Sequence, residues 1–236
     1  MIVLIDYDNV DLLEKTRGVD SVVTRLVTNI GFNALAGTPR VHVRLYGGWY
    51  EGSGRTRQAQ KLLADVAAAF PKPISVSNGT STATFIVAAE LVSSLAVEPS
   101  FEYMRTYRPR GGVGPLTSAT QPFGGCASPT TCTLAVVETL VTTGRCPASG
   151  CNVLMSDIIT RPQQKLVDTL MTADLIHFAA TSTSWVAIAS SDDDLWPGIR
   201  TAVRFGTPII HLQTKSGRRP SSTYLPNTST YSYRPF

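Results

Sequence analysis

The sequence contains no hydrophobic run that approaches the ~18–20 apolar residues a membrane-spanning helix needs. It also lacks a glycine-rich phosphate loop with its Lys-Ser/Thr, a G-x-S-x-G elbow, and a G-x-G-x-x-G after an expected strand. Residues 1–6 have no basic segment and reach a carboxylate at Asp6, so we expect no signal peptide. Because 43% of the 236 residues are hydrophobic, the chain can form a real core, and we expect a soluble cytoplasmic protein.

Acidic residues are scarce and unevenly placed. Seventeen Asp and Glu face 21 Lys and Arg, which gives a net charge of +4, and no acidic residue follows Asp194. The acids gather at Asp6/Asp8, Asp168/Asp174 and residues 192–194. Clustered acids in a basic chain suggest a metal site within a surface that attracts phosphate, although an ordinary uneven surface charge gives the same counts.

The hydrophobic pattern predicts strands that alternate with helices. We expect strands at residues 2–6, 40–46, 185–190 and 208–212, and helices at 20–30, 55–70, 161–180 and 193–205. This alternation is typical of a three-layer, Rossmann-like α/β fold, with a mostly parallel sheet covered by helices on both faces. The simplest layout is a single domain over residues 1–236, with an insertion near 108–151 and a basic, polar tail near 213–236.

Three aspartates are expected to meet at one edge of this sheet. Asp6 ends the first strand, Asp192 follows the strand at 185–190, and Asp168 lies on the preceding helix, three residues after Lys165. Carboxylates brought together repel one another, and a divalent cation is the usual remedy. Oxygen ligands without His or Cys favour Mg²⁺ or Mn²⁺ over zinc. Taken singly, Asp6 could cap a turn and Asp168 could be a solvated helix residue.

Three segments in order resemble the NYN family of PIN-like nucleases. They are IDYDNV at residues 5–10, KLVD at 165–168 and VAIASSDDDLWP at 186–197, and FGTPII at 205–210 looks like the family's closing helix-Gly-strand. The resemblance implies a PIN-like fold with Asp6, Asp168, Asp192 and Asp194 as metal ligands. It also places Asn9 at the edge of the site and Lys165 beside it, where the lysine could meet a phosphate or balance the acids. Ser191 and Leu195 depart from the family's usual glycine and aromatic residue.

The activity implied by this resemblance is phosphodiester hydrolysis with Mg²⁺ or Mn²⁺, with RNA as the favoured nucleic acid and no membrane partner. Basic residues of the early strand-helix unit, including Arg44, Arg55, Arg57 and Lys61, could line the substrate path, with Trp49 stacking on a base. The alternative is a basic helix face with core aromatics. The oligomeric state is left open, including a homo-oligomer.

All four cysteines fall in one stretch, with the pattern Cys126-x5-Cys132-x13-Cys146-x4-Cys151. Two close pairs separated by a short spacer favour a structural Zn²⁺ site in the insertion, with four thiolate ligands. Two disulfides, which fit a cytosolic chain poorly, and unliganded cysteines are the alternatives.

Two other functions compete with the nuclease. Residues 6–10 also match the first motif of haloacid-dehalogenase-like phosphatases, with Asp6 as nucleophile and Asp8 as general acid/base. A non-catalytic RNA-binding module is the second alternative, although binding phosphate alone favours losing carboxylates.

Overall fold

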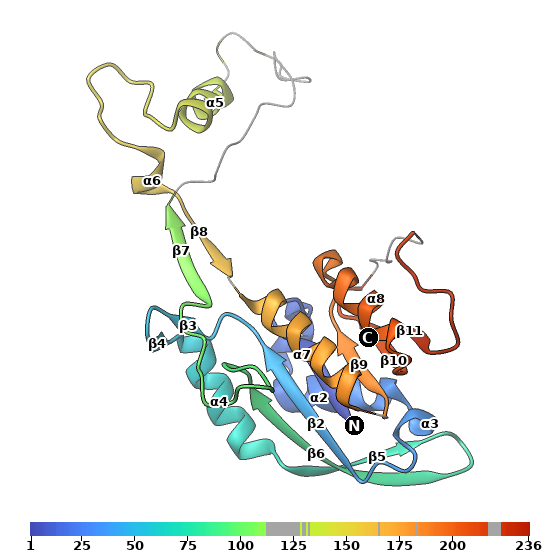
Figure 1. The fold of residues 1–236 in the computed structure, drawn as a ribbon. Coiled ribbons are helices and arrows are strands. Elements are labelled where there is room, and N and C mark those ends of the chain that lie inside the picture. The colour runs from blue at the N-terminus through green and yellow to red at the C-terminus, as the bar shows by residue number, and fades with distance from the viewer. Residues whose placement is uncertain (112–127, 129–130, 132, 165, 183, 217–222) are drawn as a thin grey trace. The chain divides into compact units, whose positions relative to one another are not determined.

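Strand β1 (Ile2–Asp6) is the central strand of a seven-stranded sheet in the computed structural model of the chain (Figure 1). The structure describes residues 1–111, 128, 131, 133–164, 166–182, 184–216 and 223–236. They fall into two units, each described here by itself: a main unit of residues 1–106 and 164–236, and an insert unit of residues 107–163.

The sheet of the main unit has the strand order β11-β10-β9-β1-β2-β6-β5. Neighbouring strands are parallel except β5, which runs antiparallel to β6. Besides β1, the strands are β2 (Arg40–Tyr46), β5 (Lys72–Ser77), β6 (Thr82–Leu91), β9 (Val186–Ala189), β10 (Ile209–Gln213) and β11 (Tyr231–Pro235). Ile5 is in register with Leu45 of β2 and Ala189 of β9, so the carboxyl ends of these three strands lie side by side.

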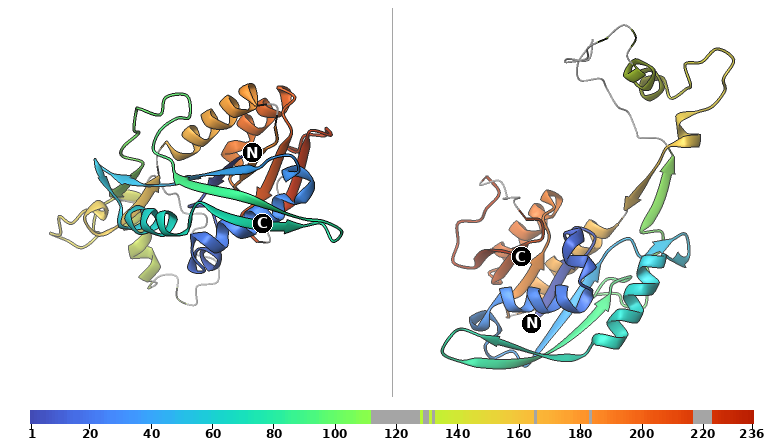
Figure 2. Two further views of the ribbon diagram at one scale, coloured as in Figure 1. Left: turned by 90° about the horizontal axis from the view of Figure 1, so that it is seen from below. Right: turned by 180° about the vertical axis from the view of Figure 1, so that it is seen from behind.

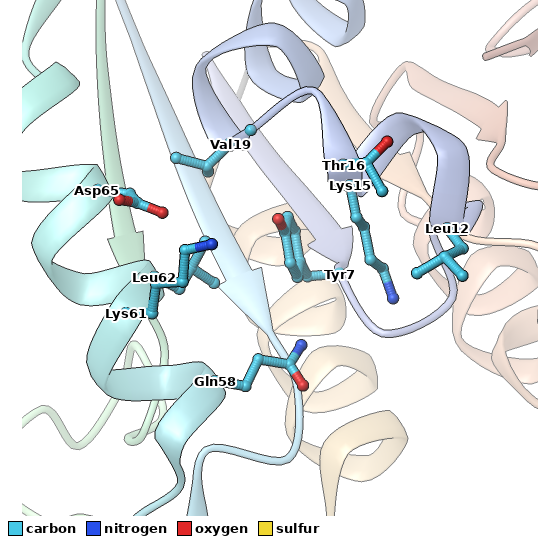
Figure 3. A pocket seen from close by; sticks show the side chains of 10 residues that line it. Tyr7, Leu12, Lys15, Thr16, Val19, Gln58, Lys61, Leu62 and Asp65 are labelled. Carbon is cyan, nitrogen blue, oxygen red and sulfur yellow. The ribbon is translucent and has the colours of Figure 1, made fainter.

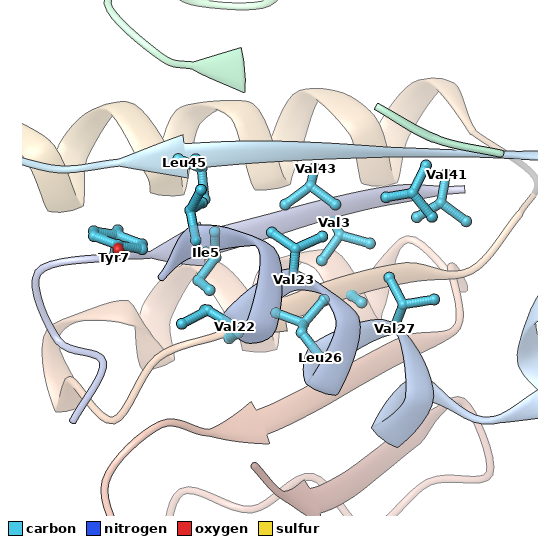
Figure 4. Packing of buried hydrophobic residues seen from close by; sticks show 14 of the residues in the cluster. Val3, Ile5, Tyr7, Val22, Val23, Leu26, Val27, Val41, Val43 and Leu45 are labelled. Atoms are coloured by element: carbon cyan, nitrogen blue, oxygen red, sulfur yellow. The ribbon is translucent and has the colours of Figure 1, made fainter. Parts of the chain in front are cut away.

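Helices cover both faces of this sheet, which explains why β1 is apolar without alternation. Val3 and Ile5 belong to one core with the buried face of α2 (Val19–Ile30), as Figure 4 shows. The buried residues of α4 (Arg57–Ala69) belong to the same core. Leu4 belongs to the opposite core, beneath α7 (Val167–Thr181) and α8 (Trp196–Arg204). The view from below shows α4 and α7 on opposite sides of the sheet (Figure 2). The expected mixed α/β, Rossmann-like architecture is therefore confirmed.

Helix α2 shows how periodicity builds this core. Its buried residues recur at helical spacing and are Val19, Val22, Val23, Leu26, Val27 and Ile30. Each such side chain contributes about 1.5–3 kcal/mol when it is fully buried. This face of α2 packs against β1 and β2 and fixes the strand whose last residue is Asp6.

Short elements complete the main unit. Two small helices flank α2, α1 (Leu12–Thr16) before it and α3 (Phe32–Leu35) after it. After β2 the chain forms an antiparallel pair, β3 (Tyr50–Glu51) and β4 (Gly54–Arg55), and a 3-10 turn, η1 (Asp193–Leu195), precedes α8. Thr56 begins α4, since its side-chain oxygen accepts a hydrogen bond from the Ala59 amide at 3.2 Å.

The insert unit contains a strand pair, β7 (Tyr107–Gly111) and β8 (Thr160–Gln164), and the helices α5 (Thr133–Thr143) and α6 (Met155–Ile158). The predicted insertion ran over residues 108–151, whereas this unit spans 107–163. Cys146 and Cys151 are free thiols here. Cys126 and Cys132 lie outside the described residues, so the zinc site remains a prediction.

Two sequence expectations about elements were wrong. The helix expected at 161–180 begins at Val167, because Leu166 adopts a left-handed backbone with φ 67° and residues 160–164 form β8. The argument that placed Lys165 and Asp168 on one helical face therefore fails. The tail near 213–236 contains a strand, β11, whose Tyr231 and Tyr233 pair with β10 although the surrounding sequence is polar. Within the described part of the chain, no helix is long and apolar enough to cross a membrane.

Candidate metal centre

Asp6, Asp168 and Asp192 meet at the carboxyl edge of the sheet. Asp6 is the last residue of β1, Asp168 lies in the first turn of α7, and Asp192 follows β9. One carboxylate oxygen of each lies within 4.8 Å of the other two. The structure thus brings together three of the four acids that the sequence suggested, across 186 positions of the chain from Asp6 to Asp192.

Asp6 is buried, with 2% of its surface exposed. Its two carboxylate oxygens accept separate hydrogen bonds, Oδ1 from the Asn9 amide at 3.2 Å and Oδ2 from the Ser190 hydroxyl at 3.0 Å. Burial raises the pKa of Asp6 to about 6, against the lowering effect of these hydrogen bonds, and the charges of Asp168 and Asp8 raise it further. The neutral donors around Asp6 orient its carboxylate but do not neutralise it.

Asp168 sits at the N-terminal end of α7, where the helix dipole favours a negative charge. Burial, followed by the charges of Asp192 and Asp194, nevertheless raises the pKa of Asp168. The chain enters α7 through Leu166, whose left-handed backbone is unusual for a residue other than glycine. Strain of this kind is tolerated where it sets the direction of a functional side chain, and here it precedes Asp168 by two residues.

Asp192 is held by its own turn. Its Oδ1 accepts a hydrogen bond from the Asp194 amide at 3.0 Å, and its amide donates to the Ser190 hydroxyl oxygen at 3.0 Å. The Asn9 side-chain amide donates to Asp192 Oδ2 at 3.5 Å. Ser190 therefore links Asp6 to Asp192, and Asn9 contacts both acids.

The chemistry of the donors fits a hard divalent cation. At 4.8 Å and an effective dielectric constant of about 20, two unit charges repel by about 3 kcal/mol. The Asn9 Oδ1 atom is buried and accepts no hydrogen bond from the described residues, so one polar atom near the acids is unsatisfied. The cluster consists of three carboxylates without His or Cys, and such a set of oxygens can hold a divalent metal ion.

Two neighbouring acids lie outside the cluster. Asp194 is exposed and acts on the site through its charge on Asp168 and its amide bond to Asp192. Asp8 accepts hydrogen bonds from the Gly48 amide at 2.7 Å and from the Gln58 side chain at 3.2 Å. It thereby ties the loop after β2 to α4.

The predicted substrate-binding residues have diverse surroundings. Trp49 is 2% exposed and donates its indole N–H to the Leu45 carbonyl, so it belongs to the core and cannot stack on a base. Arg44 forms ion pairs with Asp174 and Glu90, which gives it a structural task. Arg55 lies over the Tyr50 ring and Arg57 is exposed at the start of α4, while Lys165 lies outside the described residues.

Sequence reasoning missed Lys15. Its ammonium donates to the Asp8 carbonyl at 2.8 Å, and burial lowers its pKa although the charges of Asp8 and Asp6 raise it. Lys15 lies in a five-residue helix without periodicity, so nothing in the sequence points toward the acids. The sequence also gives no sign that the Ser190 hydroxyl links Asp6 to Asp192, although Ser190 lies within the third motif.

Comparisons with known proteins identify no relative, since no protein-family model, curated protein or solved structure matches the chain.

Proposed function

We propose that the protein is a metal-dependent nuclease, with RNA as the favoured substrate and with Mg²⁺ or Mn²⁺ held by Asp6, Asp168 and Asp192. The observation that carries the proposal is the meeting of these three carboxylates at the carboxyl edge of a parallel sheet. The resemblance of the three motifs to the NYN family of PIN-like nucleases supports the choice of phosphodiester hydrolysis. The net charge of +4 suits a polyanionic substrate.

The residues of the site have separate tasks in this proposal. A divalent cation bound there would supply the positive charge that activates water and stabilises the leaving oxygen. Ser190 and the Asn9 amide fix both oxygens of Asp6, and the Asp194 amide fixes Asp192. Asp168 contributes a half-buried carboxylate from the start of α7, and Asp194 adds negative charge at the rim.

A phosphatase that uses Asp6 as a nucleophile is less well supported. Each Asp6 oxygen accepts a hydrogen bond, which lowers its nucleophilicity but leaves a lone pair for a cation, and the side chain is only 2% exposed to an incoming phosphate. Asp8, which would act as the general acid/base, is held by Gly48 and Gln58. A non-catalytic RNA-binding module has no use for three clustered carboxylates.

The experiment that tests the proposal combines metal binding with cleavage. Mn²⁺ binding by calorimetry and cleavage of labelled RNA and DNA oligonucleotides in Mg²⁺, Mn²⁺ or EDTA are measured for the wild type, Asp6→Asn, Asp168→Asn and Asp192→Asn. Asp193→Asn is the matched control, because Asn keeps the oxygen that accepts from the Trp196 indole. We expect the three cluster variants to lose Mn²⁺ binding and cleavage while the control keeps both. RNA binding without cleavage in every metal would favour the binding module instead.

A further inference from the structure

A groove lies between α1 and α4, beside the acidic cluster (Figure 3). Its volume is about 410 Å³, within the range of about 300–1,000 Å³ that is usual for small-molecule sites. Tyr7 forms its floor with Val19 and Leu62, and Lys15 and Lys61 stand on its opposite walls. The groove therefore combines an apolar bottom with cationic sides.

The groove adjoins the metal centre through the backbone. Tyr7 directly follows Asp6, and Lys15 of the groove wall donates to the carbonyl of Asp8. Gln58 lines the groove and donates to the carboxylate of Asp8. A polymer whose phosphate lies at the acids can thus extend a neighbouring unit into the groove.

Polar groups in the groove are available to a ligand. The Tyr7 side chain is 5% exposed, yet its hydroxyl forms no hydrogen bond with a described residue and points into the space between α1 and α4. Lys61 and Asp65 also form no ion pair or hydrogen bond with residues that the structure describes. The Tyr7 hydroxyl, Lys61 and Asp65 line the groove, so a ligand there can form hydrogen bonds and an ion pair with them.

The combination of groups fits a nucleotide better than a free anion or an apolar ligand. Leu12 is 76% exposed at the rim and offers an apolar surface for a base, while Tyr7 and Asp65 can bond its polar edge. Lys15 and Lys61 suit the phosphates on either side. A carboxylate is unfavourable next to phosphate alone, but it accepts hydrogen bonds from base N–H groups.

We propose that this groove binds one unpaired nucleotide of the substrate strand, with the base beside the Tyr7 hydroxyl and its N–H groups facing Asp65. The proposal rests on the proposed nuclease function, since it assigns the groove to a neighbour of the scissile phosphate. It implies that the nucleotide must leave a duplex to enter, so single-stranded nucleic acid should bind better than the same sequence in a duplex.

Binding without cleavage tests the groove by itself. The anisotropy of a fluorescein-labelled, mixed-sequence single-stranded RNA is measured with the full-length protein in EDTA, for the wild type, Lys61→Glu and Asp65→Asn. Arg204→Glu makes the same charge change as Lys61→Glu at an exposed position of α8, and Asp193→Asn makes the same change as Asp65→Asn outside the groove. Circular dichroism verifies that every variant is folded.

We expect Lys61→Glu to raise Kd about tenfold more than Arg204→Glu does. Asp65→Asn should raise Kd several-fold although it removes a negative charge, whereas attraction by net charge alone predicts tighter binding. An Asp65→Asn variant that binds as well as the wild type or better, with equal effects of Lys61→Glu and Arg204→Glu, would overturn the proposal.

The two proposals can fail separately. If the wild type cuts no RNA in Mn²⁺ but the groove variants weaken binding as expected, the groove stands and the nuclease assignment falls. If the wild type cuts RNA and neither groove variant changes Kd, the nuclease stands and the groove belongs to another class of ligand, such as a peptide.

Discussion

Replacing Asp6 with Asn should stabilise the metal-free protein at neutral pH, although it removes a ligand of the proposed metal site. Burial raises the pKa of Asp6 from 3.8 to about 6. The ionised form is therefore less favourable in the folded protein than in the unfolded chain by about 3 kcal/mol, since one pKa unit corresponds to about 1.4 kcal/mol. Asn is neutral, so it avoids this cost.

The direction of the pH dependence follows from the pH at which Asp6 binds a proton in the folded and in the unfolded state. Between pH 3.8 and about 6 the folded protein keeps a proton on Asp6 that the unfolded chain has lost, so the stability of the wild type falls as pH rises through this window. Asn in place of Asp6 keeps one oxygen acceptor and loses the other, which costs about 1 kcal/mol. The variant should thus be about 2 kcal/mol more stable than the wild type above pH 6.5.

The assay is urea denaturation in EDTA at pH 4, 5, 6 and 7, followed by circular dichroism. The difference between the free energies of unfolding of the variant and the wild type should rise with pH and level off above about pH 6. Saturating Mn²⁺ should reverse the order at pH 7, because a ligand at 100 times its Kd stabilises the wild type by about 2.7 kcal/mol. A difference that stays constant from pH 4 to 7 would refute the reasoning.

Three further predictions concern the groups around the site. Ser190→Ala removes the hydroxyl that joins Asp6 to Asp192, and it should weaken Mn²⁺ binding about tenfold in a calorimetric titration without unfolding the protein. Asp174→Ala leaves the Arg44 guanidinium and the Tyr46 hydroxyl without their buried carboxylate, and urea denaturation should show a loss of about 3 kcal/mol. Burial lowers the pKa of His211 to about 4, so its NMR titration should have a midpoint there, and its contribution to stability should be lost as pH falls from about 6.5 to about 4.

The meeting of the three aspartates was predictable from the sequence for a physical reason. Parallel strands place their carboxyl ends at one edge, so the ends of two buried strands suffice to bring Asp6 and Asp192 together. Asp168 was placed correctly although its helix begins six residues later than expected, because the acid lies within the common part of the expected and observed helices. The start of α7 was misjudged because Pro162 suits a first helical turn as well as an edge strand.

What sequence reasoning could not predict depends on contacts between distant residues. Trp49 is an aromatic residue among basic ones, a pattern that is typical of base stacking. Only the packing of its ring against Tyr7 and its burial show that it belongs to the core. The charge of Arg44 suggested substrate binding, but its guanidinium donates a hydrogen bond to the buried carboxylate of Asp174, 130 positions away in the sequence. The order of polar and apolar residues along the chain cannot separate a buried or paired side chain from one that is free to bind a substrate, because the difference depends on tertiary contacts.

The two buried aspartates of the main unit show why the acidic cluster calls for a functional explanation. Asp174 is fully buried, and Arg44, the Tyr46 hydroxyl and the Ala96 amide all donate to it. Asp6 is almost as deeply buried, yet within the described residues it forms no ion pair, and two further carboxylates face it. The fold can therefore compensate a buried carboxylate, and it does so at Asp174 but not at Asp6. A cation bound there would supply the missing positive charge, and the Mn²⁺ titrations test whether it does.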